Sequence, residues 1–264
     1  MTGNSEIEDT TPVTAEQLLA FANQLRQQLP RFMMEYRFAV DEMLTKVSIL
    51  REEFIHLHQY NPIEHVTSRV KSPEGILEKV VRRGCAPTLE EIRKNITDIA
   101  GIRITCSFLK DAYHVLDLVT SQHDIRVLQI KDYIKNPKPN GYKSLHAILE
   151  LPVYLSQGPV PVIVEVQIRT IAQDFWASLE HKIFYKYEGG VPDHLAEDLV
   201  AAADAAELLD RHMERLYDEV HGGEQSSPSN ASESTVDEKL WRNLWKLASN
   251  GSSSQKRNEY GASS

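Results

Sequence analysis

The stretch Val162-Ile163-Val164-Glu165-Val166-Gln167-Ile168-Arg169-Thr170 alternates buried-type apolar residues with a second set that includes three polar side chains. Successive side chains of a strand point to opposite faces, so this pattern predicts a strand over 160–169 with its valines and Ile168 in the core. Glu165, Gln167 and Arg169 then share the other face. A carboxylate in so apolar a strand is costly to bury unpaired, so Glu165 needs a cation, a metal ion or a solvent-filled cleft. A salt bridge to Arg169 or to a neighbouring residue is the structural alternative.

A loop rich in basic residues precedes this strand, with the sequence Lys135-Asn136-Pro137-Lys138-Pro139-Asn140-Gly141-Tyr142-Lys143-Ser144-Leu145-His146. Its prolines, Asn140 and Gly141 suit neither a helix nor a central strand. Lysines on a loop supply positive charge for phosphate, and a tyrosine offers a ring on which a base can stack. The two segments together therefore predict a nucleotide site.

Composition limits the class of protein. The chain has 264 residues, of which 41% are hydrophobic and 25% charged, as in one large globular domain with appendages. Its net charge of −9 argues against a duplex DNA partner. No apolar run of about 18 residues predicts a membrane span, and the N-terminus does not resemble a signal peptide. Cys85 and Cys106 lack the spacing of a zinc site, which favours a reduced protein of the cytoplasm.

Apolar periodicity and capping residues predict an α+β fold with a mixed sheet of about five strands flanked by helices, extended by helices at both ends. A capping box at Thr14 opens a helix that is expected to end at Pro30. Ser72 and Thr88 are predicted helix caps, and Gly84 a helix stop. The predicted strands are 66–71, 99–108, 125–130, 144–151 and 160–169, and the other predicted helices are 36–57, 73–83, 112–122, 170–187 and 192–220.

The ends of the chain carry separate signals. Residues 1–13 are polar and are predicted to be disordered, and residues 14–190 are predicted to form the main domain. Residues 191–221 are predicted to form a C-terminal helix used in oligomerisation. Residues 222–264 begin with a Gly/Ser/Pro/Asn-rich linker and are predicted to continue as a short amphipathic helix and a tail.

A second acidic residue can complement Glu165. Asp98 stands where the strand over 99–108 begins, and two carboxylates plus substrate phosphates are a usual environment for Mg²⁺. An isolated aspartate before a strand is more often a cap. The cations that would meet a polyphosphate, each of them an ordinary surface charge when taken alone, are Arg69, Lys71, Arg103, Lys131 and Lys138.

Four segments in order resemble the motif set of the RelA/SpoT synthetase domain: Arg69-Val70-Lys71-Ser72, Asp98-Ile99-Ala100-Gly101-Ile102-Arg103, Lys138-Pro139-Asn140-Gly141-Tyr142-Lys143-Ser144-Leu145-His146 and Glu165-Val166-Gln167-Ile168-Arg169-Thr170. Phe175-Trp176-Ala177 and Glu180-His181-Lys182 also fit. The resemblance spans roughly residues 35–190. It implies a nucleotidyltransferase-like synthetase fold. The helices before Arg69 lack an adjacent His-Asp pair, so a small alarmone synthetase without hydrolase or ribosome-sensing domains is expected.

The resemblance also implies a reaction, in which pyrophosphate passes from ATP to the 3′-hydroxyl of GDP or GTP and gives ppGpp or pppGpp plus AMP. Asp98 and Glu165 would be catalytic and would hold Mg²⁺, with Glu165 acting as base, metal ligand or both. The residues implied for ATP are Arg69, Lys71, Ser72, Lys79, Arg82 and Arg103, of which Arg69 and Arg103 would sandwich adenine. Those implied for GDP or GTP are Lys131, Lys138, Asn140, Tyr142, His146 and Gln167, with guanine stacked on Tyr142.

The family further implies a homo-oligomer, commonly a tetramer, and it leaves room for regulation by RNA or by (p)ppGpp. Two other functions stay open at this point. One is a nucleotide-sensing module on the same fold that has lost turnover. The other is a single-stranded RNA binder that uses the basic loop and Tyr142 as a stacking platform, although carboxylates in the same cleft disfavour it.

Overall fold

The computed structural model describes residues 15–57, 60–184 and 192–221. The chain divides into two compact units, Met1–Leu216 and Tyr217–Ser264, and the sheet lies in the first. The predictions of disorder over 1–13, of a cap at Thr14, of helix over 185–187 and of a linker, helix and tail over 222–264 all fall outside the described residues. Among the described residues, no helix combines the length and hydropathy needed to span a membrane.

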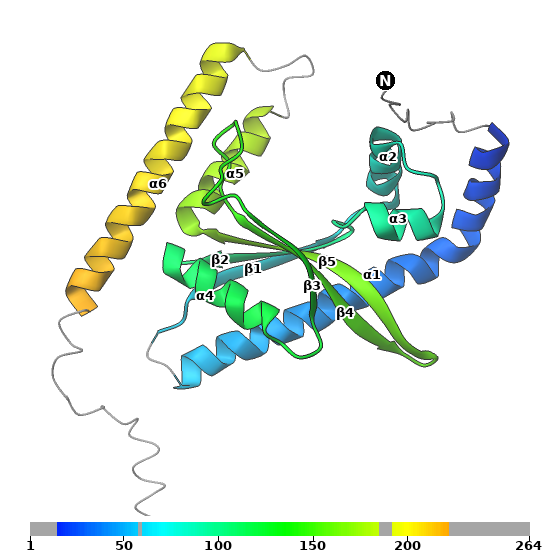
Figure 1. The fold of residues 1–264 in the computed structure, drawn as a ribbon, viewed down its shortest axis with the longest axis horizontal. Helices are drawn as coiled ribbons and strands as arrows, with labels where there is room; N and C mark the ends of the chain where they lie inside the picture. The colour runs from blue at the N-terminus through cyan, green and yellow to red at the C-terminus, as the bar shows by residue number, and fades with distance from the viewer. Residues whose placement is uncertain (1–14, 58–59, 185–191, 222–264) are drawn as a thin grey trace, which may run out of the picture. The chain divides into compact units, whose positions relative to one another are not determined.

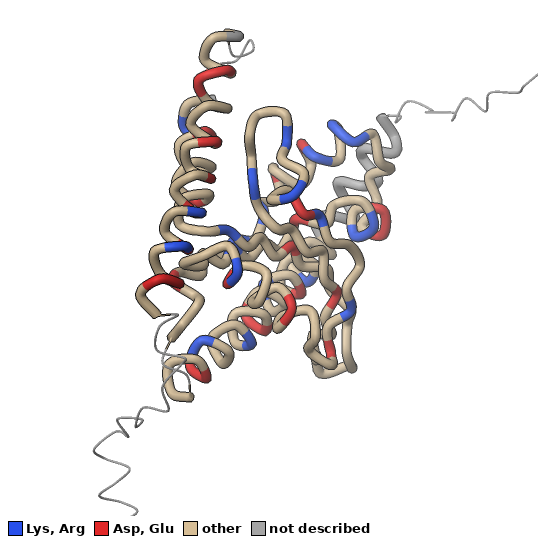
Figure 2. Tube along the Cα trace, turned by 60° about the vertical axis from the view of Figure 1, so that its left-hand side comes forward, with Lys and Arg blue, Asp and Glu red and all other residues tan. Residues whose placement is uncertain are grey.

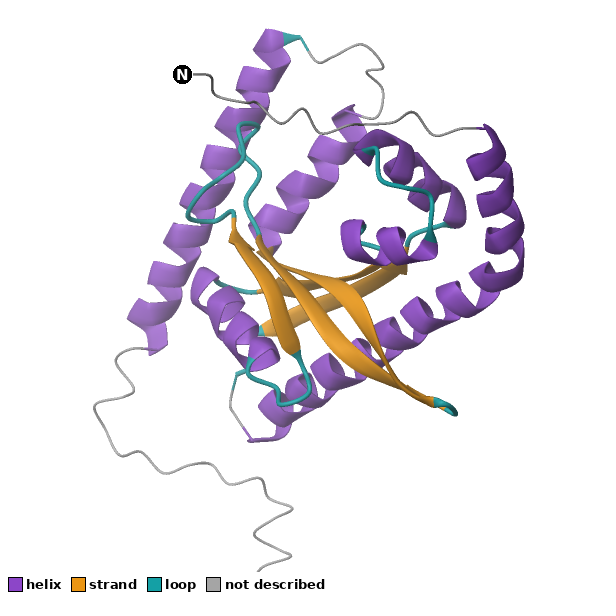
Figure 3. Cartoon of the chain, turned by 45° about the vertical axis from the view of Figure 1, so that its right-hand side comes forward, coloured by secondary structure: helices purple, strands orange, loops and turns teal. Residues whose placement is uncertain are grey.

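The centre of the fold is a mixed five-stranded sheet, as the sequence predicts. Its spatial order is β1-β2-β5-β4-β3 (Figure 3). β2 and β5 are parallel, and the other neighbouring strands are antiparallel. The strands are β1 (Ile63–Val70), β2 (Ala100–Cys106), β3 (Arg126–Asp132), β4 (Leu145–Leu155) and β5 (Gly158–Thr170).

Helices lie on both sides of this sheet (Figure 1). The long helix α1 (Ala15–Leu57) and α4 (Leu109–Thr120) pack on one face and close the main core. On the other side, α2 (Pro73–Arg83) and α3 (Leu89–Asn95) stand apart from α5 (Ile171–Phe184) and α6 (Asp193–His221). The fully buried side chains of the core include Tyr36, Met43, Ile102, Ile104, Val164, Val166 and Ile168.

Local capping signals explain where several helices begin and end. The Ser72 side chain accepts a hydrogen bond from the Gly75 amide, and Gly84 ends α2 in the left-handed conformation with φ of 64°. Thr88 caps α3 in the same way as Ser72 caps α2. These three predictions are confirmed, because each depends only on residues close in the sequence.

The predicted helix end at Pro30 is wrong, since α1 continues through it as far as Leu57. A proline inside a helix costs about 3 kcal/mol through one lost hydrogen bond and a ring clash. Burial of one large apolar side chain contributes about 1.5–3 kcal/mol, and α1 buries several against the sheet after Pro30, including Phe32, Tyr36 and Met43. Tertiary packing therefore outweighs the local preference, and the ribbon of α1 bends instead of ending (Figure 1).

Helix α6 is attached to the sheet by polar contacts within the first unit. The Thr170 hydroxyl at the end of β5 donates to Oδ2 of Asp210 at 2.7 Å, and Nζ of Lys143 lies 2.6 Å from Oε2 of Glu207. Both Asp210 and Lys143 are buried. Burial raises the pKa of Asp210 to about 6, although the hydrogen bond from Thr170 opposes the shift.

We expect Asp210 to make stability depend on pH. Its folded-state pKa lies above its unfolded value, so protonated Asp210 favours the fold below about pH 4, and this contribution is lost as pH rises through about 6. Asp210→Asn stays neutral and should raise the free energy of unfolding at pH 8, by up to about 3 kcal/mol, with little effect at pH 4. Urea unfolding at both pH values measures this. Asp198→Asn, at an exposed position of α6, is the control, and an equal effect of Asp210→Asn at both pH values would contradict the assignment.

Candidate active site

Strand register places polar side chains in two rows on the sheet face opposite α1. Directly paired residues of neighbouring strands point to the same face. The first row, in sheet order, consists of Thr67, Arg103, Gln167, His146 and Lys131. The second row consists of Arg69, Gly101, Glu165, Ile148 and Gln129. Candidate residues that lie far apart in the sequence therefore become neighbours.

The members of these rows on β1, β2 and β5 form the floor of a cavity of about 530 Å³, a volume typical of nucleotide-sized ligands. Tyr142 and five residues of α5 line its sides: Ala177, Ser178, Glu180, His181 and Lys182. Gly101 lies in the middle of the floor, where an added Cβ would meet the Arg69 side chain at 3.5 Å. That distance is an ordinary van der Waals contact, so the Arg69 side chain packs directly over Gly101. The predicted site residues that line this cavity are Arg69, Arg103, Tyr142, Glu165 and Gln167.

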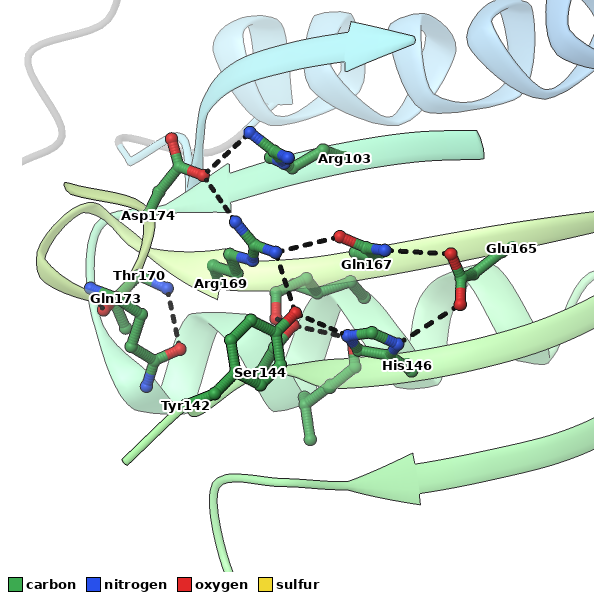
Figure 4. A network of polar contacts seen from close by, with 12 residues as sticks. Arg103, Tyr142, Ser144, His146, Glu165, Gln167, Arg169, Thr170, Gln173 and Asp174 are labelled. Carbon is green, nitrogen blue, oxygen red and sulfur yellow. Dashed lines mark hydrogen bonds and ion pairs between the residues drawn. The ribbon is translucent and has the colours of Figure 1, made fainter. Parts of the chain in front are cut away.

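Glu165 and four other side chains form a closed ring of polar contacts (Figure 4). Oε1 of Glu165 lies 3.3 Å from Nδ1 of His146, and Nε2 of His146 lies 2.7 Å from the Tyr142 hydroxyl. The Arg169 guanidinium donates to that hydroxyl at 2.7 Å and to Oε1 of Gln167 at 3.0 Å. The Gln167 amide donates back to Oε2 of Glu165 at 2.9 Å, which closes the ring. Of the alternative that the sequence left open, a salt bridge to Arg169 or to a neighbouring residue, the structure has the second form, because Glu165 pairs with His146 and not with Arg169.

The ring assigns a direction to its hydrogen bonds. Tyr142 accepts from Arg169, so its own proton is free to point at Nε2 of His146, and the imidazole proton then sits on Nδ1, facing Glu165. Burial alone would raise the pKa of Glu165. The hydrogen bond and attraction of His146, together with the Gln167 amide, outweigh burial and hold that pKa below its ordinary value. Glu165 is thus ionised at neutral pH.

Asp98 belongs to a second cluster, on the side of the cavity where α2 lies. Its Oδ1 lies 2.6 Å from Nζ of Lys79, and its Oδ2 lies 3.3 Å from Nζ of Lys71. Burial would raise the pKa of Asp98, but these two lysines outweigh it and lower the pKa. The charge of Asp98 acts on Glu165 in turn and raises the pKa of that carboxyl, so the two carboxylates are electrostatically coupled.

The donor atoms of this region suit Mg²⁺. Asp98 and Glu165 offer ionised carboxylate oxygens, and Oδ1 of Asp98 is buried without a hydrogen bond of good geometry. No group of three or more His, Cys, Asp or Glu residues in the described part of the chain could hold a metal ion by itself. A Mg²⁺ ion here would need further oxygen ligands from the phosphates of a substrate. Proteins usually bind Mg²⁺ in this way, with one or two carboxylates plus substrate phosphates.

The loop between β3 and β4 is held by contacts on several sides. Nζ of Lys138 lies over the rings of Tyr133 and Tyr142, 4.8 and 4.6 Å from their centroids. The Asn140 side chain accepts from the Tyr142 amide and donates to Glu180 of α5 at 3.1 Å. These contacts fix the Tyr142 ring at the cavity wall. Basic residues follow this loop and α2, whereas α6 carries many acidic ones (Figure 2).

The other predicted residues do not line the cavity: Asp98, Lys71 and Lys79 form the cluster beside α2, Lys138, Asn140 and His146 contact Tyr142, and Ser72, Arg82 and Lys131 lie elsewhere. Ser72 is engaged as the cap of α2, Arg82 is exposed in its last turn, and Lys131 is exposed on the edge strand opposite His146. Sequence reasoning missed Arg169 and Asp174 as members of the site. Arg169 shares a strand face with Glu165, which was the available signal, whereas Asp174 is recognisable only once the start of α5 is placed beside the strand ends.

Ionised carboxylates, clustered cations and a half-buried tyrosine ring around one cavity on a mixed sheet define a nucleotide-dependent phosphoryl- or pyrophosphoryl-transfer protein. Residues 68–190 match the region found in RelA/SpoT proteins. The GTP pyrophosphokinase YwaC of Bacillus subtilis (strain 168) is 50% identical over 188 residues, which are 71% of this chain and 90% of that protein. The GTP pyrophosphokinase YjbM of the same strain is 40% identical over 194 residues, with 74% and 90% covered.

Solved structures agree with these relatives. The small alarmone synthetase 2 from Bacillus subtilis has a TM-score of 0.67 and 46% identity, with 73% of this chain and 99% of that chain covered. The small alarmone synthetase 1 from Bacillus subtilis bound to its product pppGpp has a TM-score of 0.69 and 39% identity, with 74% and 98% covered. The chain belongs to the RelA/SpoT-type (p)ppGpp synthetase family, among its small alarmone synthetases.

We expect Gly141 to be required for the shape of the Tyr142 loop. Its φ is +86°, and an added Cβ would lie 2.6 Å from Cβ of Ala203 on α6. Gly141→Ala should therefore cost more than the 1–2 kcal/mol or so of a left-handed conformation and should raise the KM for the acceptor nucleotide. Gly84→Ala is the matched control, because its φ is also positive but nothing lies within 4 Å of the added Cβ. Equal losses in chemical unfolding of the two variants would contradict this reading.

Proposed function

We propose that this protein transfers pyrophosphate from ATP to the 3′-hydroxyl of GDP or GTP and so makes ppGpp or pppGpp plus AMP. The observation that carries the proposal is that one cavity is lined by Arg69 and Arg103 on β1 and β2, by Glu165 on β5 and by Tyr142. Two nucleotides, one placed against the arginines and one against Tyr142, would bring their reacting groups together above Glu165. The names of the relatives, GTP pyrophosphokinase and small alarmone synthetase, support the same reaction.

The donor nucleotide is proposed to occupy the side formed by β1, β2 and α2. Arg69 and Arg103 line the cavity floor from adjacent strands, and guanidinium planes stack well on a purine. Lys71 and Lys79 lie by Asp98, where the phosphates of ATP would compete for their ammonium groups. Ser72 and Arg82, on the same helix, are proposed to contact the phosphates at its first and last turns.

The acceptor nucleotide is proposed to occupy the side formed by β4, β5 and the Tyr142 loop. The ring of Tyr142 would stack on guanine, and Lys138 beside it would meet a phosphate. Asn140 and Gln167 offer amide groups, and His146 a ring nitrogen, within the same network. Lys131, which pairs in register with His146, would add charge at the edge of the sheet.

Catalysis would rest on positioning and charge, because phosphoryl transfer leaves little covalent work to the protein. The acceptor 3′-oxygen attacks the β-phosphorus of ATP, the bond from that phosphorus to the α–β bridging oxygen breaks, and AMP leaves. Asp98 and Glu165 would hold Mg²⁺, which supplies positive charge to the phosphate oxygens when bound. The lowered pKa of Glu165 makes it a weak base. We therefore assign it mainly to metal binding and orientation, and less to removal of the 3′-hydroxyl proton.

Other properties expected from the family belong to the same proposal. Self-association, as a tetramer, is supported by an exposed apolar stripe along α5 at helical spacing: Ile171, Phe175, Leu179 and Ile183. A location in the cytoplasm is supported by the two cysteines, because both are free thiols, as is usual in a reducing compartment. Regulation by RNA or by (p)ppGpp stays a prediction. A sensing module without turnover is the second candidate, and the ionised carboxylates in the cavity favour the enzyme.

We expect Glu165→Gln and Asp98→Asn to abolish turnover while the protein remains folded. Each substitution removes a carboxylate charge at the transferring group and should lower kcat at least about 100-fold, roughly 3 kcal/mol of barrier. The test is ATP, Mg²⁺ and GDP or GTP with purified protein, with products separated by anion exchange and unfolding followed in parallel. Glu150→Gln, on β4 but paired with Arg126 outside the cavity, is the control. Near-normal synthesis by either site variant would refute the metal assignment, and no product from the unaltered protein would favour the sensing module.

We expect Tyr142→Ala to act mainly on the acceptor. Loss of a stacked ring costs about 1–3 kcal/mol for a base, so the KM for GDP or GTP should rise roughly 5- to 150-fold. The KM for ATP should change much less, because Arg69 and Arg103 lie on other strands. Steady-state kinetics with each nucleotide varied in turn measures both values. An unchanged acceptor KM would count against stacking on this residue.

A further inference from the structure

Asp174 joins the two proposed nucleotide subsites through one oxygen atom. Its Oδ1 lies 3.1 Å from NH1 of Arg169, at the end of β5, and 3.3 Å from NH1 of Arg103, on β2 (Figure 4). Asp174 itself belongs to the first turn of α5. Three elements therefore meet at a single carboxylate, which joins the arginine proposed to stack on adenine to the arginine that contacts Tyr142.

Arg169 transmits any change at Asp174 to the acceptor side. Its side chain is 6% exposed, and one terminal nitrogen donates both to the Tyr142 hydroxyl and to Gln167. Its Nε is buried without a hydrogen-bond partner, so the group is held only through its two terminal nitrogens. Because the guanidinium is a rigid planar fork, a rotation that alters the contact with Asp174 also alters the contact with Tyr142.

Two arginines compete for this carboxylate. Burial is the largest effect that lowers the pKa of Arg103, and the nearby charge of Arg169 lowers it further. The charge of Asp174 opposes both effects. The arginines thus repel each other and share one neutralising group. An adenine that stacks on Arg103 would draw this guanidinium toward the base and leave Oδ1 of Asp174 to Arg169.

We propose that Arg169 is a positioning residue and Asp174 its shared counter-ion, and that together they couple the two subsites so that ATP and the guanine nucleotide bind with positive cooperativity. This inference rests on the proposed function. ATP binding strengthens the Asp174–Arg169 contact, which fixes the Tyr142 hydroxyl and orients the ring for stacking. By linkage, the guanine nucleotide must increase the affinity for ATP by the same factor.

The coupling is measured by calorimetry on the full chain with Mg²⁺. GDP is titrated into the protein alone and into protein saturated with AMPCPP, whose methylene bridge prevents pyrophosphate transfer. We expect AMPCPP to increase the affinity for GDP at least about fivefold, and GDP to increase the affinity for AMPCPP equally. Product formation from ATP and GDP is assayed on the same preparation, so that a failure of the proposed function is seen separately.

Two isosteric variants test the route of the coupling. Asp174→Asn keeps the shape but removes the charge, and Tyr142→Phe keeps the stacking ring but removes the hydroxyl that Arg169 holds. Each should reduce the coupling to less than about twofold, and the double variant should lose no more than either single one, because both act on the same chain of contacts. Asp124→Asn, which removes the partner of Lys46 on the other side of the fold, should keep the coupling of the unaltered protein.

Each result decides the inference. Coupling that is lost in both single variants and is non-additive in the double one supports it, provided that thermal unfolding shows folded proteins. An active protein without coupling overturns it, and so does full coupling in Asp174→Asn or additive losses. If Asp174→Asn does not fold, Tyr142→Phe carries the test, since retained coupling without the hydroxyl overturns the proposed route.

Discussion

The architecture of the site depends on an ionised glutamate in β5, the central strand of the sheet. Glu165 lies between Val164 and Val166, which are fully buried on the opposite face, and such a charge is tolerated only with partners. His146 and Gln167 supply these partners directly. Since His146 in turn needs Tyr142, and Gln167 needs Arg169, the requirement of one carboxylate organises a ring that reaches from the sheet to the loop.

The alternation of side chains along the strands places the residues of the core on one face of the sheet and those of the site on the other. One face of β2 and β5 packs under α1 and α4, whereas the other face points its polar side chains into the cavity. A shift of one residue in register would exchange the two faces, so the core fixes the register and the register fixes the rows of the site. Arg103, Gln167 and His146 are adjacent for this reason, although they come from three different strands.

Features that depend on neighbouring residues were predictable from the sequence, and those that depend on distant contacts were not. The faces of the strand at 162–169, the cap at Ser72 and the stop at Gly84 follow from local rules, and the structure has them. The prediction of a helix end at Pro30 was wrong because packing against the sheet, which is distant in the sequence, stabilises the continuation of α1. The motif order identified the family, but the partners of Asp174 depend on where β2 and α5 meet in space. Sequence spacing does not contain that information.

Lys143 shows how the acceptor side depends on residues beyond the motifs. From sequence it counted among the cations of the basic loop, yet it is buried and paired with Glu207 of α6. Gly141 lies against Ala203, so two residues of this segment contact α6 directly, and Trp176 of α5, beside Tyr142, donates to the Leu199 carbonyl of α6 at 2.9 Å. The region shared with RelA/SpoT proteins ends at residue 190, before α6 begins. The segment that carries Tyr142 therefore packs on a helix outside that region, so the contacts of α6 contribute to the orientation of Tyr142 and to the proposed acceptor site.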